Sequence, residues 1–209
     1  MSKNFLLRFF SSLLLGPLVV FTVYLESYFF YLLLVIIITL AIFETLKLKV
    51  KKIKIFIFFL LIIFTLSALQ IYNLNNGKYV IIFILLLSWL SDIGGYVFGK
   101  FIGGEKIKII SPNKTYSGFV GSFLFVQSFG FYAKSLNISF LNEAVLNFHF
   151  LLICTLAVIS GDMLFSYFKR ICHIKDFSNF LPGHGGLLDR IDGLILLTIF
   201  VYIAKLWIL

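Results

Sequence analysis

The chain has 209 residues, of which 61% are apolar, 19% are aromatic and only 13% are charged. A soluble domain usually carries about 45–50% apolar and about 25% charged residues, so the composition excludes an ordinary water-soluble domain. It also excludes a disordered chain, because there is too much apolar surface to leave in water. The length suits one domain, with room for about seven spanning helices of about 20 residues each. We therefore expect an all-α, polytopic integral membrane protein.

Apolar runs mark the expected helices, which lie in chain order at 9–25, 28–43, 55–72, 79–98, 117–133, 146–168 and 193–209. Only Glu26 and Ser27 separate the first two runs, which predicts a tight helical hairpin. We expect the first run to be a retained helix, because no small-x-small cleavage site precedes Glu26. Within one membrane domain, we divide the chain into N-terminal spanning helices at 1–78 and a catalytic region at 79–209.

Basic residues indicate the orientation of these helices. With seven spans, the N-terminus and the loops near 44–54, 99–116 and 169–192 lie on one side of the membrane. The formal net charge is +9, and all but three of the 18 basic residues fall on that side; the exceptions are Lys78, Lys134 and Lys205. The positive-inside rule makes this side cytoplasmic. The charge then reflects topology and attraction to anionic headgroups, and we expect no binding to nucleic acid.

Two aspartates, Asp92 and Asp162, lie inside predicted spanning helices. A carboxylate at the centre of a bilayer costs on the order of 3 kcal/mol, so it is retained where it faces a partner, a metal or water. Ser166, Lys169 and Arg170 share the helical face of Asp162. The alternative for this helix is a structural ion pair between Asp162 and Lys169, and Asp92 has the same ambiguity.

A glycine-rich loop, Pro182-Gly-His-Gly-Gly186, follows that helix and surrounds His184 with glycines. Such a loop can bring several N–H groups close to an anion. Asp189 and Asp192 come next, on one face of the helix that begins there. They could serve only to complement the helix dipole, but with Asp162 they make three carboxylates at one membrane boundary. Carboxylates, waters and substrate phosphates are the ligands that Mg²⁺ prefers.

Basic residues accompany these carboxylates. The cations that could bind phosphate are Lys114, Lys169, Arg170, Lys175 and Arg190. The segment Ser111-Pro-Asn-Lys-Thr115 adds hydroxyl groups beside Lys114, and its proline favours a turn. Together these features predict a metal-dependent phosphate site on the cytoplasmic side.

The motifs that carry this prediction are Ser166-x-x-Lys-Arg170, Lys175-Asp176, Leu181-Pro-Gly-His-Gly-Gly186 and Asp189-Arg-x-Asp192. Their order and spacing resemble the C-terminal signature of the phosphatidate cytidylyltransferase (CDP-diacylglycerol synthase) family. Asp92-x-Gly-x-Tyr96 and Ser111-Pro-x-Lys-Thr115 are similar to two upstream motifs of that family. The resemblance covers about residues 88–194.

The chain departs from the family pattern at a few positions. Phe165 stands where a glutamate usually precedes the signature serine, and His173-Ile-Lys-Asp-Phe-Ser178 replaces the usual Gly-Val-Lys-Asp-Ser-Gly. Ile93 replaces a common threonine, and Gly193 replaces a common serine. Apart from the missing glutamate, no departure removes a charged group of the predicted site.

The resemblance implies a multi-pass enzyme of the cell inner (plasma) membrane, with its N-terminus and active site cytoplasmic. Such an enzyme couples CTP to phosphatidic acid, releases pyrophosphate and requires Mg²⁺, with room for a second, monovalent or divalent cation. The implied partners are CTP, phosphatidic acid and the lipid bilayer. The resemblance leaves open whether the protein forms a homodimer.

The resemblance also implies roles for individual residues. The catalytic residues would be Asp162, Lys169, Asp189 and Asp192, and the three aspartates among them would hold the metal. The residues expected to bind substrate are Asp92, Ser111, Lys114, Thr115, Ser166, Arg170, Lys175, Asp176, His184, Gly185, Gly186 and Arg190.

Two other functions are alternatives. The first is a CTP-dependent transferase or kinase acting on another lipid, such as an isoprenoid alcohol or an archaeal ether lipid, since the motifs concern phosphate and metal rather than the lipid tail. The second is a transporter or channel that uses Asp92 and Asp162 for ions. Transport is disfavoured because the acidic and basic residues cluster toward one membrane face and form no path across it.

Overall fold

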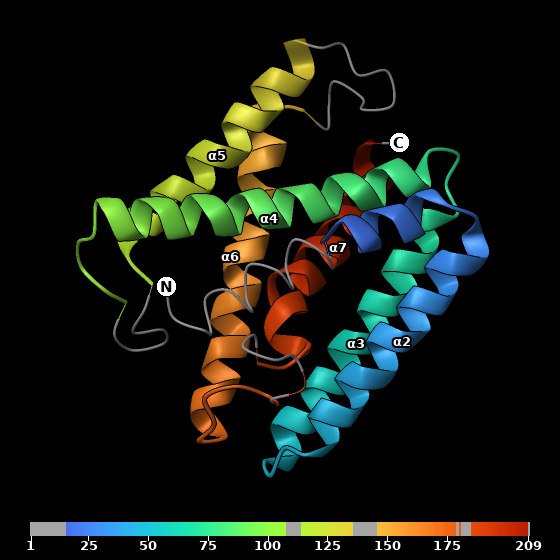
Figure 1. Cartoon of the computed structure of the whole chain (residues 1–209), viewed down its shortest axis with the longest axis vertical. Helices are drawn as coiled ribbons and strands as arrows, with labels where there is room; N and C mark the ends of the chain where they lie inside the picture. The colour runs from blue at the N-terminus through green and yellow to red at the C-terminus, as the bar shows by residue number, and fades with distance from the viewer. Residues whose placement is uncertain (1–15, 108–113, 136–145, 179, 181–184, 209) are drawn as a thin grey trace.

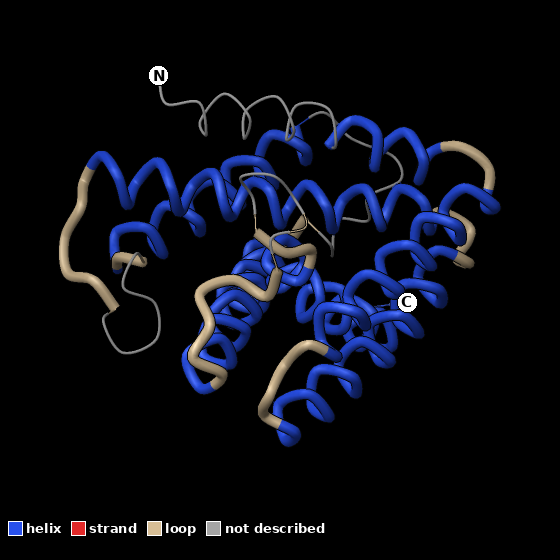
Figure 2. Tube along the Cα trace, turned by 60° about the horizontal axis from the view of Figure 1, so that its bottom comes forward, coloured by secondary structure: helices blue, strands red, loops and turns tan. Residues whose placement is uncertain are grey.

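The computed structural model describes residues 16–107, 114–135, 146–178, 180 and 185–208. Within these residues the structure is helical and has no strand (Figure 2). The named helices are α2 (Ser27–Leu46), α3 (Lys51–Tyr72), α4 (Gly77–Phe101), α5 (Tyr116–Ser135), α6 (Phe148–Ile171) and α7 (Leu188–Ile208). Residues 16–24 form a further helical segment before α2. Every predicted apolar run coincides with a helix, the first as far as it is described, so the all-α prediction is confirmed.

Four of the described helices, α2, α3, α4 and α6, are long and apolar enough to cross a membrane. The structure thus agrees with a polytopic membrane protein. Among the described residues, α5 and α7 do not meet this criterion of length and hydropathy. Glycines and serines recur along α5, and α7 carries three charged residues, Asp189, Arg190 and Asp192, near its start. Seven spans and the orientation of the chain stay predictions.

The helices do not form a simple parallel bundle. In Figure 1, α2 and α3 lie side by side as a hairpin, whereas α4 crosses the other helices at a steep inclination. α6 and α7 pack as a second pair, and α3 packs against α7, which joins the hairpin to this pair. Side chains at these contacts form the interior; Ile57 and Ile71 of α3 and Ile195 of α7 are fully buried.

The closest helix pair is α4 and α5, and small residues permit it. A Cβ atom added at Gly94 would lie 2.4 Å from the carbonyl oxygen of Gly121, and one at Gly121 would lie 2.4 Å from that of Gly94. The Ser122 hydroxyl donates a hydrogen bond of 2.6 Å to the carbonyl of Ser91. Small residues and interhelical hydrogen bonds of this kind are typical of helix packing in membranes. They bring Asp92 of α4 close to the segment that begins α5.

α6 and α7 cross at Gly161 and Gly193. A Cβ at Gly161 would lie 2.5 Å from the carbonyl oxygen of Asp192, and one at Gly193 would lie 2.9 Å from Cγ1 of Val158. A side chain at Gly161 would force the backbone of Asp192 to shift, and one at Gly193 would press against the side chain and carbonyl oxygen of Val158. The crossing places Asp162 and Asp192, each adjacent to one of these glycines, on facing surfaces. The replacement of the common serine by Gly193 therefore has a structural reason.

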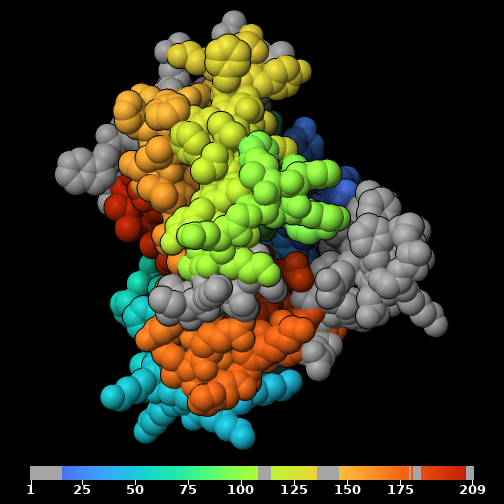
Figure 3. Space-filling model, turned by 90° about the vertical axis from the view of Figure 1, so that its left-hand side faces the viewer, coloured from blue at the N-terminus to red at the C-terminus, as the bar shows by residue number. Residues whose placement is uncertain are grey.

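The turn between α2 and α3 lies near the C-terminal end of α6. In Figure 3, the end of α6 and the following loop (orange) lie directly beside the start of α3 (cyan). The rings of Phe56 in α3 and Phe168 in α6 make an edge-to-face contact at 5.5 Å. This contact brings the N-terminal hairpin to the region that holds the predicted motifs.

Candidate active site

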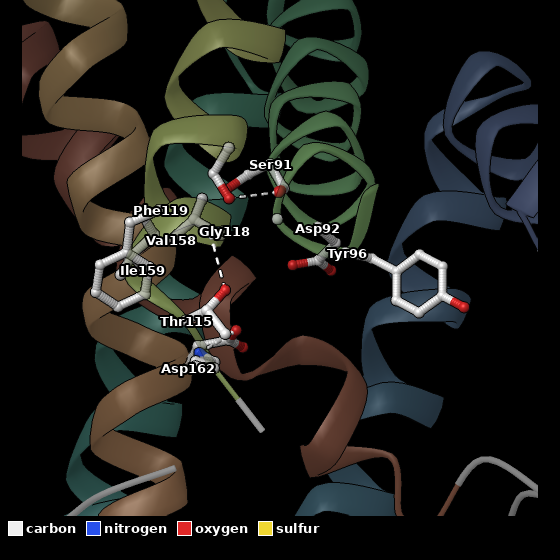
Figure 4. Close-up of a pocket in the computed structure, with 12 residues that line it drawn as sticks. Ser91, Asp92, Tyr96, Thr115, Gly118, Phe119, Val158, Ile159 and Asp162 are labelled. Atoms are coloured by element: carbon white, nitrogen blue, oxygen red, sulfur yellow. Dashed lines mark hydrogen bonds and ion pairs between the residues drawn. The ribbon is translucent and has the colours of Figure 1, made fainter. Parts of the chain in front are cut away.

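A pocket of about 180 Å³ lies between α4, α5 and α6. Its charged lining consists of Asp92 from α4, Lys114 from the segment before α5, and Asp162 from α6. Figure 4 shows Asp92 pointing into the space bordered by Thr115 and Asp162, whereas the ring of Tyr96 points away from it. The pocket therefore brings together charged residues from three segments that are far apart in the sequence.

Lys114 and Asp162 form an ion pair in this pocket. The Nζ atom of Lys114 lies 2.5 Å from Oδ2 of Asp162, and the two side chains are 24% and 27% exposed. Both are thus accessible to a ligand. The alternative of an ion pair between Asp162 and Lys169 is wrong, because Lys169 pairs with Asp189 instead.

Asp192 adds a third carboxyl group beside Asp162. It is 8% exposed, it lies close enough to Asp162 for the two carboxyl groups to interact, and its Oδ1 accepts the N–H of Gly193 at 2.9 Å. Asp92 in turn is close enough to interact electrostatically with Asp162, Lys114 and Arg190. We call Asp92, Lys114, Asp162 and Asp192 the pocket cluster. It contains three carboxyl groups and one lysine, so its carboxyl groups outnumber its basic groups.

A second cluster lies where α6 ends and α7 begins. Lys169 Nζ contacts Oδ1 of Asp189 at 2.6 Å, and these side chains are 14% and 6% exposed. The other oxygen of Asp189, Oδ2, accepts the N–H groups of Phe177 at 2.9 Å and Gly186 at 3.0 Å. Asp189 therefore links the end of α6, the following loop and the first turn of α7.

Glu44, at the end of α2, joins this second cluster and was not predicted. It is 4% exposed. Its Oε1 accepts the hydroxyl of Ser178 at 2.6 Å and the N–H of Leu187 at 2.7 Å, and its Oε2 accepts the N–H of Leu188 at 2.8 Å. The available signal was modest: Glu44 is the only acidic residue between Glu26 and Asp92. We call Glu44, Lys169, Ser178 and Asp189 the clasp.

The remaining predicted residues occupy varied positions. Thr115 is buried, and its hydroxyl accepts the N–H of Gly118 at 3.1 Å, so it caps α5. Gly185 lies beside the side chains of Asp176 and Asp189. Ser166 is partly buried, and the exposed members of the predicted set are Arg170, Lys175, Asp176 and Arg190. Ser111 and His184 lie outside the described residues.

Two departures from the family motif have clear structural surroundings. Phe165 is fully buried and packs edge-to-face against Phe168 and Phe177, so it belongs to the core rather than to the pocket. His173 adopts a left-handed conformation, with φ of 54°, just after α6. The N–H of Ile174 then reaches the carbonyl of Lys169 at 3.0 Å, which closes the helix end. Glycine is the usual residue for that conformation.

The predicted metal ligands lie in both clusters. Among the described residues, no three His, Cys, Asp or Glu side chains converge into a metal-binding group. Asp162 and Asp192 adjoin each other, and two adjacent carboxyl groups favour a proton or a cation between them. Asp189 instead contacts Lys169 and two N–H groups. The donor chemistry of Asp162 and Asp192 therefore fits a hard cation such as Mg²⁺, and the three-ligand set stays a prediction.

Comparison with known proteins identifies the family of this chain. Among curated proteins, the phosphatidate cytidylyltransferase of Staphylococcus aureus (strain COL) is 40% identical over 119 residues, which cover 56% of this chain and 45% of the relative. The protein of the same name from Staphylococcus haemolyticus (strain JCSC1435) is 37% identical over 123 residues, with the same 56% and 45% coverage. The chain thus spans about half the length of the curated relatives it matches. Residues 50–207 match the family described as "Cytidylyltransferase family", and the chain therefore belongs to the cytidylyltransferase family.

Proposed function

We propose that this chain transfers the cytidylyl group of CTP to phosphatidic acid in the membrane, which yields CDP-diacylglycerol and pyrophosphate. The observation that carries the proposal is the pocket cluster, in which charged residues of α4, of α6 and of the segment before α5 meet around a small pocket in a chain of the cytidylyltransferase family. The relatives named phosphatidate cytidylyltransferase support the choice of lipid acceptor.

The proposed reaction needs no covalent enzyme intermediate. A phosphate monoester has a second pKa of about 6, so near pH 7 the phosphate of phosphatidic acid is present in part as a dianion and is already a nucleophile. One of its oxygens attacks the α-phosphorus of CTP in line, which forms a new P–O–P bond. The bond between the α-phosphorus and the oxygen that bridges to the β-phosphate breaks, and that electron pair leaves with pyrophosphate. The task of the protein is to bring two anions together and hold them in line.

Basic residues of both clusters would perform this task. Lys114 and Lys169 are held in place by Asp162 and Asp189, so their ammonium groups are oriented before substrate arrives. Arg170, Lys175 and Arg190 are exposed and would bind the phosphates further from the reacting atom. The proposed nucleotide-positioning residues are Asp92, Ser111, Thr115, Ser166, Asp176, His184, Gly185 and Gly186.

A divalent cation fits the carboxylates of the proposed site. Asp162 and Asp192 would hold Mg²⁺, and Asp189 would complete the set by exchanging its contact with Lys169 for the cation. When bound, Mg²⁺ would neutralise phosphate charge and orient the phosphate oxygens. Two lysine ammonium groups already lie against Asp162 and Asp189, which supports both carboxylates as cation-binding groups.

The membrane setting supports a lipid acceptor. The described helices expose large apolar side chains such as Phe59, Ile62 and Phe131, which suit contact with lipid tails. The turn between α2 and α3 presents a run of lysines, Lys47, Lys49, Lys51 and Lys52, which would attract anionic headgroups. We place the N-terminus and the site on the cytoplasmic side of the inner or plasma membrane, where this basic turn would lie.

The acceptor can be tested with the purified full chain in detergent. We would incubate it with CTP labelled at the α-phosphate, Mg²⁺ and phosphatidic acid, and then measure label in the extracted lipid. We expect labelled CDP-diacylglycerol that requires all three components. Parallel reactions would replace phosphatidic acid with an isoprenoid alcohol or an ether-lipid phosphate. Label transferred only to one of these lipids would contradict the proposed acceptor.

A further inference from the structure

Glu44 lies outside the family match at residues 50–207, yet its carboxylate is buried against the start of α7. We propose that Glu44 is a positioning residue: it fixes the first turn of α7, and with it Asp189 and Asp192, in the arrangement that binds CTP with its magnesium ion. The proposal rests on the proposed function, because it concerns the same nucleotide site. It assigns a role in that site to the N-terminal hairpin.

The hydrogen bonds of Glu44 satisfy groups that otherwise lack partners. The first N–H groups of a helix have no carbonyl within the helix to bond to. Glu44 accepts the N–H of Leu187 at 2.7 Å and that of Leu188 at 2.8 Å. Its negative charge also lies at the positive end of the α7 dipole. A carboxylate is therefore better suited to this position than any neutral group.

The space for this carboxylate depends on a glycine. A Cβ atom at Gly186 would lie 2.8 and 2.9 Å from the two oxygens of Glu44 and 2.9 Å from the N atom of Ser178. Any side chain at Gly186 would therefore displace the carboxylate or the backbone at Ser178. The carboxylate of Glu44 thus occupies the space that a side chain at position 186 would fill.

Glu44 and Asp189 each bridge the same two stretches of backbone, residues 177–178 and residues 186–188. Asp189 connects the N–H of Phe177 to that of Gly186. Glu44 connects the hydroxyl of Ser178 to the N–H groups of Leu187 and Leu188. The two carboxylates hold residues 177–178 against residues 186–188. Removing Glu44 leaves Asp189 as the sole described side chain that bridges both segments, and the first turn of α7 gains freedom.

Ser178 is the one partner of Glu44 among the described residues that donates from its side chain, since Leu187 and Leu188 donate from the backbone. The 2.6 Å bond from the Ser178 hydroxyl therefore offers a mild way to weaken the same contact without removing the carboxylate.

The test is equilibrium binding of CTP in the presence of Mg²⁺ and without phosphatidic acid, measured on the full chain in detergent. We expect Glu44→Gln to weaken binding about tenfold, because one oxygen becomes an NH₂ group that faces N–H or O–H donors and a charge-assisted hydrogen bond is lost. Ser178→Ala should weaken binding about threefold. The matched control is Glu26→Gln, which changes the exposed glutamate just before α2, at its other end, and should leave CTP binding unchanged.

Amide hydrogen exchange separates positioning from general loss of structure. In Glu44→Gln, exchange should accelerate in peptides that contain Leu187 and Leu188 and stay unchanged in α4 and α5. Unchanged CTP binding and unchanged exchange at Leu187 and Leu188 would overturn the proposal. So would faster exchange across the whole protein in both Glu44→Gln and Ser178→Ala, since that pattern would mean a purely structural role.

The same measurements distinguish this proposal from the proposed function. A wild-type protein that binds CTP but transfers nothing to phosphatidic acid would contradict the proposed acceptor and leave the role of Glu44 to be decided by the binding comparison. A wild-type protein that does not bind CTP would overturn both.

Discussion

The pocket cluster and the clasp use the same residue types in different ways. In the clasp, each oxygen of Glu44 and Asp189 accepts hydrogen bonds from backbone N–H groups, a hydroxyl or a lysine. In the pocket cluster, three carboxyl groups lie together with one lysine, and Asp162 is about one quarter exposed. Each carboxylate oxygen of the clasp is hydrogen-bonded, whereas the pocket cluster holds more carboxyl groups than lysines and can bind a cation.

This difference predicts that charge removal acts on different quantities in the two regions. In the pocket cluster it should reduce catalytic turnover, because the residues would touch the metal or the phosphates. At Glu44, the positioning residue of the clasp, it should mainly reduce nucleotide affinity and local order.

Asp162→Asn should reduce turnover of CTP by about a thousandfold, because it removes a central carboxylate of the pocket cluster and the partner of Lys114. Pyrophosphate release at saturating substrates measures the effect. The matched control is Glu105→Gln, an exposed acid in the loop after α4, which should keep wild-type turnover. If turnover of the Asp162 variant stayed within a few fold of wild type, the proposal that the pocket cluster carries the chemistry would be contradicted.

Lys114→Ala should reduce turnover by about a hundredfold, because it removes the lysine of the pocket cluster that would neutralise phosphate charge. Lys106→Ala is the comparison. The side chain of Lys106 is exposed and its backbone pairs with that of Thr115, so its removal should have little effect. Equal losses in the two variants, measured by the same pyrophosphate assay, would mean that the active site extends beyond the pocket.

Gly161→Ala should destabilise the protein by about 2–3 kcal/mol, because the added Cβ would lie 2.5 Å from the carbonyl oxygen of Asp192 and force α6 from α7. Thermal unfolding in detergent measures the loss. Gly16→Ala provides the control, since its Cβ would meet the ring of Trp89 at 3.5 Å, an ordinary contact. A stable Gly161 variant with full activity would show that the close crossing is not needed to align Asp162 and Asp192.

His173→Gly should stabilise the protein by about 1 kcal/mol, because glycine adopts the left-handed conformation of this position without a steric cost. Thermal unfolding again provides the measurement, with turnover expected to stay at the wild-type value. Tyr167→Gly, at an exposed position inside α6, should lower stability by about 1 kcal/mol. A destabilising effect of His173→Gly would mean that the histidine side chain makes a contribution larger than its backbone strain.

The fold was predictable from the sequence where the signal is local. Long apolar runs located the helices, and the spacing of Asp189 and Asp192 placed both on the helix that begins there. Partners across the fold were not predictable from spacing alone. Lys169 and Asp162 share a helical face, yet each pairs with a residue from another segment, Asp189 and Lys114.

The partners of Glu44 likewise could not be predicted from the sequence. Its partners follow it by 134 to 144 positions in the chain, and no local pattern specifies a contact at that separation. The contact depends on where α2 ends relative to α7, which the packing of α3 against both helices determines. Gly161 and Gly193 likewise align Asp162 with Asp192 through a helix crossing that hydropathy does not encode.

The most direct test compares kcat and KM for CTP in Asp162→Asn and Glu44→Gln, by pyrophosphate release with saturating phosphatidic acid and Mg²⁺. We predict that Asp162→Asn loses kcat by about a thousandfold. We predict that Glu44→Gln keeps kcat within about threefold while its KM for CTP rises about tenfold. Wild-type kcat in Asp162→Asn, or a loss of kcat in Glu44→Gln with unchanged KM, would contradict the assignment of chemistry to the pocket cluster and of positioning to Glu44.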